Sequence, residues 1–272
     1  MKNNLLDKYG RYVSEALFTG KGKRRNLAIL EVLALEGKMT CWELTKKVFR
    51  KIEKRYPTYD ETRHFYLYRP VKKLEKHDYL MSYGTVKSKG TENPIYGLTA
   101  KGFLVANLLS LDVRNNWKKA AKNYQEDLDL PERTLMSWII NHGFSQQLFS
   151  YLFLEPFKKI VLAGGINLDI IDSEEFYKVM QEIKGQQISS MLREFTTMLS
   201  KKRATKRFRS FWQNLSQEDK KALIEMFRDQ KLKEVINGHF LGRLEQSLKD
   251  RLKNIKFVRQ KYSEYFKNKN QT

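Results

Sequence analysis

Apolar residues recur every three or four positions along most of the chain, a spacing that predicts amphipathic helices. One predicted helix covers residues 1–20, and another runs from Asn26 to Gly37, a residue suited to the left-handed position after a helix. Two capping boxes, Thr40-Cys41-Trp42-Glu43 and Thr58-Tyr59-Asp60-Glu61, open the next two helical segments. The first part of the chain is therefore predicted to form a run of short, well-delimited helices.

The segment after Thr58 combines an apolar face with a basic face. Leu67, Val71 and Leu74 share one side of the predicted helix. Four basic residues point away from that side: Arg69, Lys72, Lys73 and Lys76. Because Pro70 lacks an amide donor and crowds the preceding turn, the helix is either kinked there or begins near Arg69.

The hydrophobic period changes from 3.6 to about 2 after Asp78, which indicates extended structure. Two β-prone runs, Tyr79–Val86 and Ile95–Leu98, predict a pair of strands joined by a polar tip over residues 87–94. Thr99 then caps a further helix. The predicted order is helix, helix, helix, strand, polar tip, strand, helix.

This order, with the residues that fill it, resembles the winged helix-turn-helix of PadR-like and MarR-like transcription regulators. The stretches Leu67–Lys76 with Tyr79-Leu80, and Tyr96-Gly97-Leu98-Thr99-Ala100-Lys101-Gly102, resemble the recognition helix and the exit from the wing. Asp78 stands where these families usually have Gly, and Asp tolerates the left-handed conformation better than most residues. The resemblance covers under a third of the chain and implies a homodimer on a pseudo-palindromic promoter site, with the winged helices about one turn of DNA apart.

The fold class that follows is mainly α. Gly (14) and Pro (5) are too few for a many-stranded sandwich or barrel. We expect an N-terminal helix or arm over residues 1–21, a winged-helix DNA-binding domain with a two-stranded wing over 22–112, and an all-α region over 113–272. A 3.5-residue apolar repeat predicts a long last helix over about 240–267 that suits dimerisation. The sequence leaves open whether the all-α region holds an effector pocket, a partner surface or a second DNA contact.

Charge narrows the class of partner. Lys and Arg number 52 against 31 Asp and Glu, a formal net charge of +21. Such an excess favours a polyphosphate backbone as partner, ahead of an anionic membrane surface or an acidic protein. The chain shows no secretory signal and no uninterrupted apolar span, so we expect a soluble cytoplasmic, nucleoid-associated protein without a membrane partner.

The predicted DNA contacts are basic side chains on or near the recognition segment. Arg69 is the candidate base contact, because its planar fork pairs with guanine, and lysines neutralise phosphates. The full set is Arg69, Lys72, Lys73, Lys76, Lys87, Lys89, Lys23, Arg24 and Arg25. The alternative is that these residues only solvate an exposed helix face.

A second basic cluster lies in the all-α region. It consists of Lys201, Lys202, Arg203, Lys206, Arg207 and Arg209. Phe208, Phe211 and Trp212 beside it are either stacking groups for nucleic acid or a buried helical face. Their spacing favours the buried face.

Catalytic and metal-binding chemistry has little support. Cys41, the one cysteine, excludes an internal disulfide and is either a redox sensor at a helix start or, more simply, a small core residue. The histidines 64, 77, 142 and 239 are scattered, so no metal site is predicted. Asp127, Asp129 and Glu132 suit either magnesium or helix capping, and capping needs no extra assumption. We expect no cofactor and no enzyme activity.

Three functional hypotheses remain. The first is a sequence-specific transcriptional regulator that binds double-stranded DNA, as a homodimer, through its winged helix. The second is a nucleic-acid-binding protein of replication, segregation or chromatin that does not select a sequence, and the third is a protein-interaction scaffold.

Overall fold

A computed structural model describes residues 15–18, 22–88, 90–128, 130–155 and 205–235, with single residues and short runs between 158 and 197 and between 238 and 253. The fold is mainly helical with one small antiparallel sheet. It divides into two compact units, residues 1–179 with 215–222, and residues 180–214 with 223–272. Each unit is described by itself.

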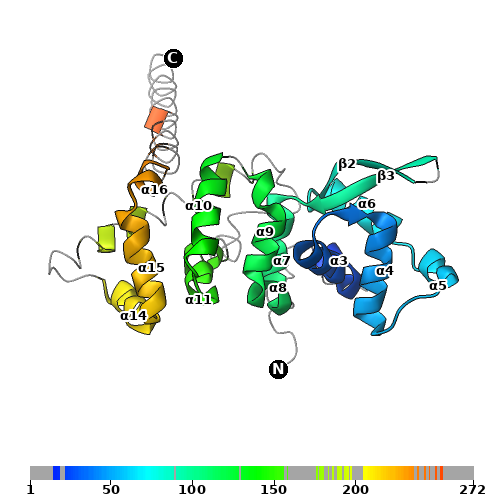
Figure 1. Ribbon diagram of the computed structural model, residues 1–272, viewed down its shortest axis with the longest axis horizontal. Helices are drawn as coiled ribbons and strands as arrows, with labels where there is room; N and C mark the ends of the chain where they lie inside the picture. The colour runs from blue at the N-terminus through cyan, green and yellow to red at the C-terminus, as the bar shows by residue number, and fades with distance from the viewer. Residues whose placement is uncertain are drawn as a thin grey trace, which may run out of the picture. The chain divides into compact units, whose positions relative to one another are not determined.

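The first unit begins with a group of helices that carries a small sheet at its edge (Figure 1). In chain order its first elements are α2 (Glu15–Phe18), α3 (Lys23–Glu36), β1 (Met39–Thr40), α4 (Cys41–Glu53), α5 (Tyr59–His64), α6 (Tyr68–Lys76), β2 (Leu80–Ser88) and β3 (Thr91–Leu98). Its later elements are, in chain order, α7 (Ala100–Leu109), α8 (Leu111–Asn115), α9 (Trp117–Tyr124), the 3-10 helix η1 (Gln125–Asp127), α10 (Leu130–Asn141), α11 (Gln146–Phe149) and the π-helix η2 (Ser150–Leu154).

Local signals in the sequence place the helix boundaries. Both capping boxes are confirmed, with the Thr40 and Thr58 hydroxyls accepting from the third amide of α4 and of α5. Gly37 ends α3 at φ +83°, as predicted. The segment around Pro70 is not one kinked helix. It forms two separate helices, α5 and α6, and α6 begins at Tyr68, close to the predicted start near Arg69. Pro70 thus lies in the first turn of α6, where an amide has no partner within the helix.

The sheet differs from the predicted pair of strands. Its order is β1-β3-β2, all antiparallel, with Met39 opposite Tyr96 and Leu80 opposite Leu98. The polar tip predicted over residues 87–94 is wrong, because the ladder continues to the pair Ser88 and Thr91. Backbone hydrogen bonds hold this polar stretch extended without needing apolar side chains. β1 was not predicted, since two residues are too short to show a period.

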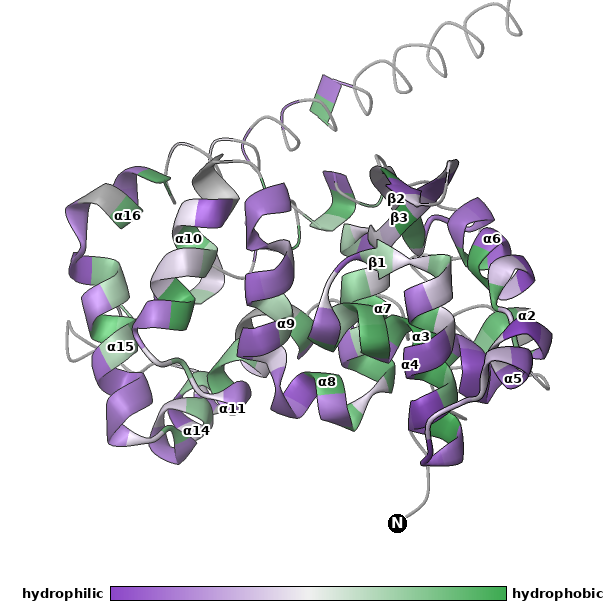
Figure 2. Cartoon of the chain, turned by 45° about the vertical axis from the view of Figure 1, so that its right-hand side comes forward, coloured by the Kyte–Doolittle hydropathy of each residue, from purple (hydrophilic) through white to green (hydrophobic). Residues whose placement is uncertain are grey.

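The core of this unit lies around α3. Ile29, Leu30 and Leu33 of α3 are fully buried. Phe18 of α2 meets Tyr79 edge-on with ring centroids 5.4 Å apart, and both rings are buried. Figure 2 shows hydrophobic residues on the central helices α3 and α7, whereas polar residues predominate on α5 and α6. Helix α6 is therefore a peripheral helix that packs against an apolar core.

The chain after residue 112 continues the same packing. Asn123 of α9 donates to the Ala34 carbonyl of α3 at 2.9 Å, and the Trp117 ring stacks on Phe149 at 4.2 Å between centroids. Gly143 follows α10 in the left-handed region, at φ +72°. The proposed domain boundary at residue 112 stays a prediction.

The second unit has its own aromatic contacts. It contains α14 (Lys206–Asn214), α16 (Gln230–Val235) and the second half of α15 (Gln217–Arg228). The Phe195 ring lies 5.7 Å from Trp212 and 5.3 Å from Phe227. The predicted last helix over 240–267 lies outside the described residues apart from isolated positions, as do residues 1–14 of the predicted N-terminal helix.

Helix α5 carries a pH-sensitive cap, which gives a first prediction. The two terminal nitrogens of the Arg55 guanidinium group donate to the Glu61 carboxylate, which also accepts from the Thr58 amide. The hydrogen bond from Arg55, followed by that from Thr58, lowers the Glu61 pKa from 4.5 to about 2. Because the folded pKa lies below the ordinary one, stability from this cap is present above pH 4.5 and is lost as the pH falls towards 2.

An NMR titration of the side-chain carboxyl carbons checks this assignment. The Glu61 signal should titrate with a midpoint near 2 in the wild type, and Arg55→Met should move it up towards the ordinary value. A wild-type midpoint at the ordinary value would show that Arg55 does not hold the cap.

Candidate nucleic-acid interface

Helix α6 separates an inward apolar side from an outward basic side. Leu67 at its N-terminal boundary, Val71 and Leu74 each have 0% exposure. Its basic residues Arg69, Lys72, Lys73 and Lys76 are all exposed. The two-faced helix predicted from the sequence is therefore present, and its basic face is open to solvent.

The C-terminal end of α6 is held by residues at the start of α7. Asp78 adopts the left-handed conformation at φ +56°, as expected for its position. The Lys101 ammonium donates to the His77 carbonyl at 2.8 Å, and the Thr99 hydroxyl donates to the Asp78 carbonyl. A Cβ at Gly102 would lie 2.0 Å from the Tyr79 carbonyl oxygen. This close approach places the start of α7 directly against the connection that follows α6.

Lys72 differs from the other basic residues of α6. Its ammonium lies 2.7 Å from the Glu75 carboxylate and 5.5 Å from the Tyr96 ring centroid. The hydrogen bond to Glu75 raises the pKa of Lys72. Arg69, Lys73 and Lys76 form no hydrogen bond or ion pair with the residues that the structure describes. These three residues are the free charges of the helix.

The antiparallel ribbon of β2 and β3 extends from the helices next to α6 (Figure 1). Lys87 on this ribbon has a side chain 82% exposed and lies 4.0 Å from Glu92. Lys89, predicted to contact DNA from the same ribbon, lies outside the described residues. The ribbon thus presents at least one exposed cation on an extended, solvated backbone.

The basic residues predicted to contact DNA near the N-terminus, Lys23, Arg24 and Arg25, lie in the first turn of α3, which begins three residues earlier than the predicted start at Asn26. Arg24 donates to the Ile52 carbonyl at the end of α4 at 2.9 Å, and the Arg25 guanidinium lies 4.8 Å from the Phe65 ring centroid. Lys23 is exposed at the first position of α3. Arg24 and Arg25 therefore help to hold α3 against α4 and the α5–α6 connection, a role that the sequence did not indicate.

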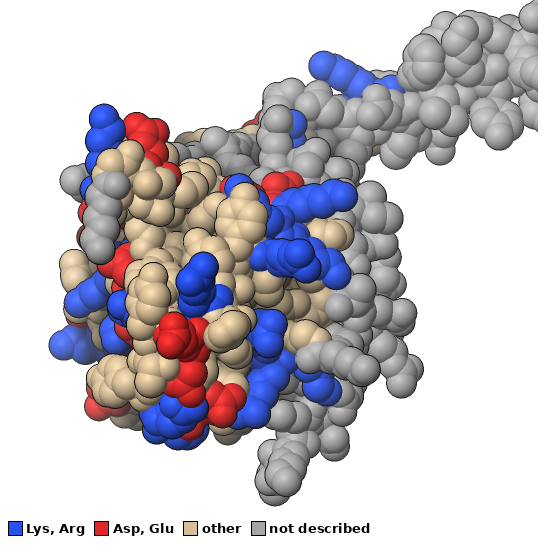
Figure 3. All heavy atoms as spheres, turned by 90° about the vertical axis from the view of Figure 1, so that its right-hand side faces the viewer, with Lys and Arg blue, Asp and Glu red and all other residues tan. Residues whose placement is uncertain are grey.

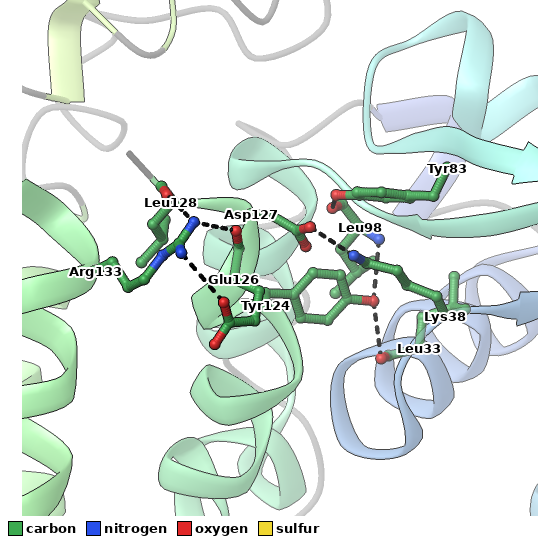
Figure 4. Close-up of polar contacts among 9 residues, drawn as sticks. All are labelled: Leu33, Lys38, Tyr83, Leu98, Tyr124, Glu126, Asp127, Leu128 and Arg133. Atoms are coloured by element: carbon green, nitrogen blue, oxygen red, sulfur yellow. Dashed lines mark hydrogen bonds and ion pairs between the residues drawn. The ribbon is translucent and has the colours of Figure 1, made fainter. Parts of the chain in front are cut away.

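The base of the ribbon is tied to α3 and α9 (Figure 4). The Tyr124 hydroxyl donates to the Leu33 carbonyl at 3.0 Å and accepts from the Leu98 amide at 3.1 Å. The Tyr83 hydroxyl donates to the Leu98 carbonyl at 2.8 Å. Burial raises the pKa of Tyr124, so its hydroxyl stays protonated and able to donate. These bonds fix the ribbon's base relative to the core.

Two ion pairs flank this joint and account for part of the acidic group around residue 127. Lys38 lies 2.5 Å from Asp127, with its ammonium 4.0 Å from the Tyr83 ring centroid. Arg133 lies 3.2 Å from Glu126 and donates to the Leu128 carbonyl at 3.1 Å. Asp127 therefore has a cationic partner of its own; the Asp129 residue and the Glu132 side chain lie outside the described part.

A row of aromatic side chains lies beside α6, and sequence reasoning missed it. We call Tyr59, Trp42, Tyr66 and Tyr68 the aromatic row. Its ring centroids are 5.7 Å apart between Tyr59 and Trp42, 6.2 Å between Trp42 and Tyr66, and 6.3 Å between Tyr66 and Tyr68. Exposure is 70% for Tyr59, 43% for Tyr66 and 50% for Tyr68. The available signal was that these rings fall outside the apolar row of Leu67, Val71 and Leu74.

Cys41 is a core residue, the simpler of its two interpretations. It is buried at 5% exposure in the first turn of α4. Burial raises the pKa of its thiol, which opposes the thiolate that a redox sensor needs. Among the residues that the structure describes, no group of three His, Cys, Asp or Glu side chains is placed to hold a metal ion.

The second basic cluster packs its aromatic residues inward where it is described. Phe208 and Phe211 are buried and Trp212 is half-buried, whereas Lys206 and Arg209 are exposed. Lys201, Lys202 and Arg203 lie outside the described residues. The interpretation of Phe208 and Phe211 as a buried helical face is confirmed.

The charged groups of the interface are unevenly distributed. Figure 3 faces the side on which α4, α5 and α6 lie in Figure 1; Lys and Arg side chains gather to the right of centre, and a smaller group of acidic side chains lies below the centre. No described helix is long and apolar enough to cross a lipid bilayer.

No family model, curated protein or solved structure matches the chain.

Proposed function

We propose that this protein binds duplex DNA through a winged helix formed by α3, β1, α4, α6, β2 and β3. In this proposal α6 is the recognition helix and the β2–β3 ribbon is the wing. The observation that carries it is the division of α6: three apolar side chains without solvent exposure on one side, and Arg69, Lys73 and Lys76 exposed and unpaired among the described residues on the other.

The dimensions of a helix and a DNA groove support this assignment. An α-helix with its side chains is about 10–12 Å wide, and the major groove is about 12 Å wide. Arg69, in the first turn of α6, is placed to offer its fork to guanine N7 and O6. Lys73 and Lys76 then neutralise phosphates, and Lys87 on the wing reaches the neighbouring backbone. Phosphate contacts set the register and Arg69 supplies base selection.

The proposed biological role is that of a transcriptional regulator acting as a homodimer. A second candidate, non-selective binding to nucleic acid, is favoured by the net charge of +21 over the whole chain. DNase footprinting on genomic fragments separates the two roles. A discrete protected site supports the regulator, and uniform protection of every fragment supports non-selective binding.

The dependence of affinity on salt gives a second prediction. Lys73, Lys76 and Lys87 amount to about three phosphate-neutralising contacts, and the slope of log K against log salt is about −0.9 per contact. We therefore expect a slope of about −3 for a blunt duplex, measured by fluorescence anisotropy between roughly 50 and 200 mM salt. A slope near zero would contradict binding through these charges.

A further inference from the structure

The aromatic row remains exposed although binding of a duplex by the basic residues of α6 does not require it. Leu67, Val71 and Leu74 fill the inward side of the helix. The rings of Tyr59, Tyr66 and Tyr68 are consequently left at the surface, 70%, 43% and 50% exposed. A contiguous exposed patch of large rings is typical of an interaction site.

Cations accompany the row and indicate the chemistry of its partner. The Lys46 ammonium lies 5.3 Å from the Trp42 ring centroid, and the Lys72 ammonium lies 5.9 Å from that of Tyr68. Arg69 follows Tyr68 directly in the chain and is exposed. Flat rings interleaved with cations suit a polyanion that carries its own flat groups, which is the chemistry of a nucleic-acid strand.

Ring stacking requires bases whose faces are accessible. In a duplex each base face is covered by its neighbours, and only the base edges are open in the grooves. In a single strand the faces are available, and stacking on aromatic side chains is worth a factor of roughly 5 to 100 in affinity per base. The row therefore fits unpaired bases.

We infer that the aromatic row stacks the unpaired bases of a strand that leaves the duplex at the N-terminal end of α6. The inference rests on the proposed function, because it places the duplex on the basic face of the same helix. Tyr68 and Arg69, adjacent in the first turn of α6, mark where the two surfaces meet. The preferred ligand is then a junction between double-stranded and single-stranded DNA.

The test compares three labelled ligands by fluorescence anisotropy with the full chain. They are a blunt duplex, the same duplex with a thymidine tail of about six nucleotides, and that duplex with an abasic tail of equal length. Since the abasic tail has the same charge but no bases, it isolates stacking. We expect the thymidine tail to raise affinity at least about tenfold over the blunt duplex, and the abasic tail to raise it only slightly.

Matched variants identify the protein side of the contact. Tyr59→Leu/Tyr68→Leu should abolish the gain from the thymidine tail, measured relative to the affinity of the same variant for the blunt duplex. Tyr59→Phe/Tyr68→Phe keeps the rings and should keep the gain. Tyr56→Leu is the control, because Tyr56 is 71% exposed and its ring is not part of the row.

Each outcome bears on one proposal. A gain that persists in the Leu variant, or that the abasic tail gives equally, overturns the inference. Equal binding of the tailed and blunt duplexes also overturns the inference. If, in that case, the Leu variant weakens self-association measured by sedimentation, the row is a contact between protein chains. Tight binding of the thymidine-tailed duplex, without any affinity for the blunt duplex or the abasic-tailed duplex, overturns the proposed function and leaves the stacking role intact.

Discussion

The variant Lys73→Glu/Lys76→Glu is expected to bind a blunt duplex roughly 100-fold more weakly than the wild type, at about 100 mM salt. Both lysines are exposed on α6 and have no partner among the described residues, so their charges are available to phosphates. Reversal removes two attractive contacts and introduces two repulsive ones. The loss corresponds to about 2.7 kcal/mol, and the slope of log K against log salt should become less negative by about 2.

A control with the same change in net charge separates local contact from the general field of a basic protein. Lys119→Glu/Lys122→Glu reverses two exposed lysines of α9, a helix outside the proposed winged helix. We expect this control to weaken binding only a few-fold, through long-range electrostatics. Equal losses in the two variants would show that binding follows net charge and not the face of α6.

The second large effect is expected from Gly102→Ala, which should destabilise the first unit by about 3 kcal/mol or more. The new methyl group would lie 2.0 Å from the carbonyl oxygen of Tyr79, a backbone atom that follows the C-terminal end of α6. Relief requires α7 and the connection after α6 to move apart. That movement strains the bond from Lys101 to the His77 carbonyl.

Thermal unfolding followed by circular dichroism measures this effect. A loss of about 3 kcal/mol lowers Tm by roughly 6–12 °C in a unit of this size. Gly22→Ala is the matched control, since its methyl group would meet only the Asn26 side chain, at 3.7 Å. An unchanged Tm for Gly102→Ala would show that the contact between α7 and the end of α6 is looser than described.

Several parts of the fold followed from signals within a few residues of one another. The capping boxes at Thr40 and Thr58, the helix stop at Gly37 and the left-handed Asp78 were all predicted correctly. Each depends on a hydrogen bond or a backbone conformation that neighbouring residues determine. The same holds for the three-residue apolar face of α6, which is set by helical periodicity.

Other parts depended on residues distant in the sequence. Strand β1 exists because Met39 and Thr40 pair with β3, more than fifty residues later in the chain. A two-residue segment contains no pattern from which that pairing could be predicted. Lys101 would be expected at the surface, but it is 1% exposed because the His77 carbonyl accepts from it. Arg24 similarly bonds the end of α4.

The same distinction between local and long-range signals applies to the candidate interface. By itself the sequence determined the helix boundaries, the split of α6 into an apolar and a basic side, and the excess of positive charge, because these properties depend on residue type and local spacing. Only the tertiary structure decided which basic residues lack a partner among the described residues, where the β2–β3 ribbon is anchored, and that rings from α4, α5, α6 and the α5–α6 connection form one row. Such properties arise from packing between segments, where distance in space is independent of distance along the chain.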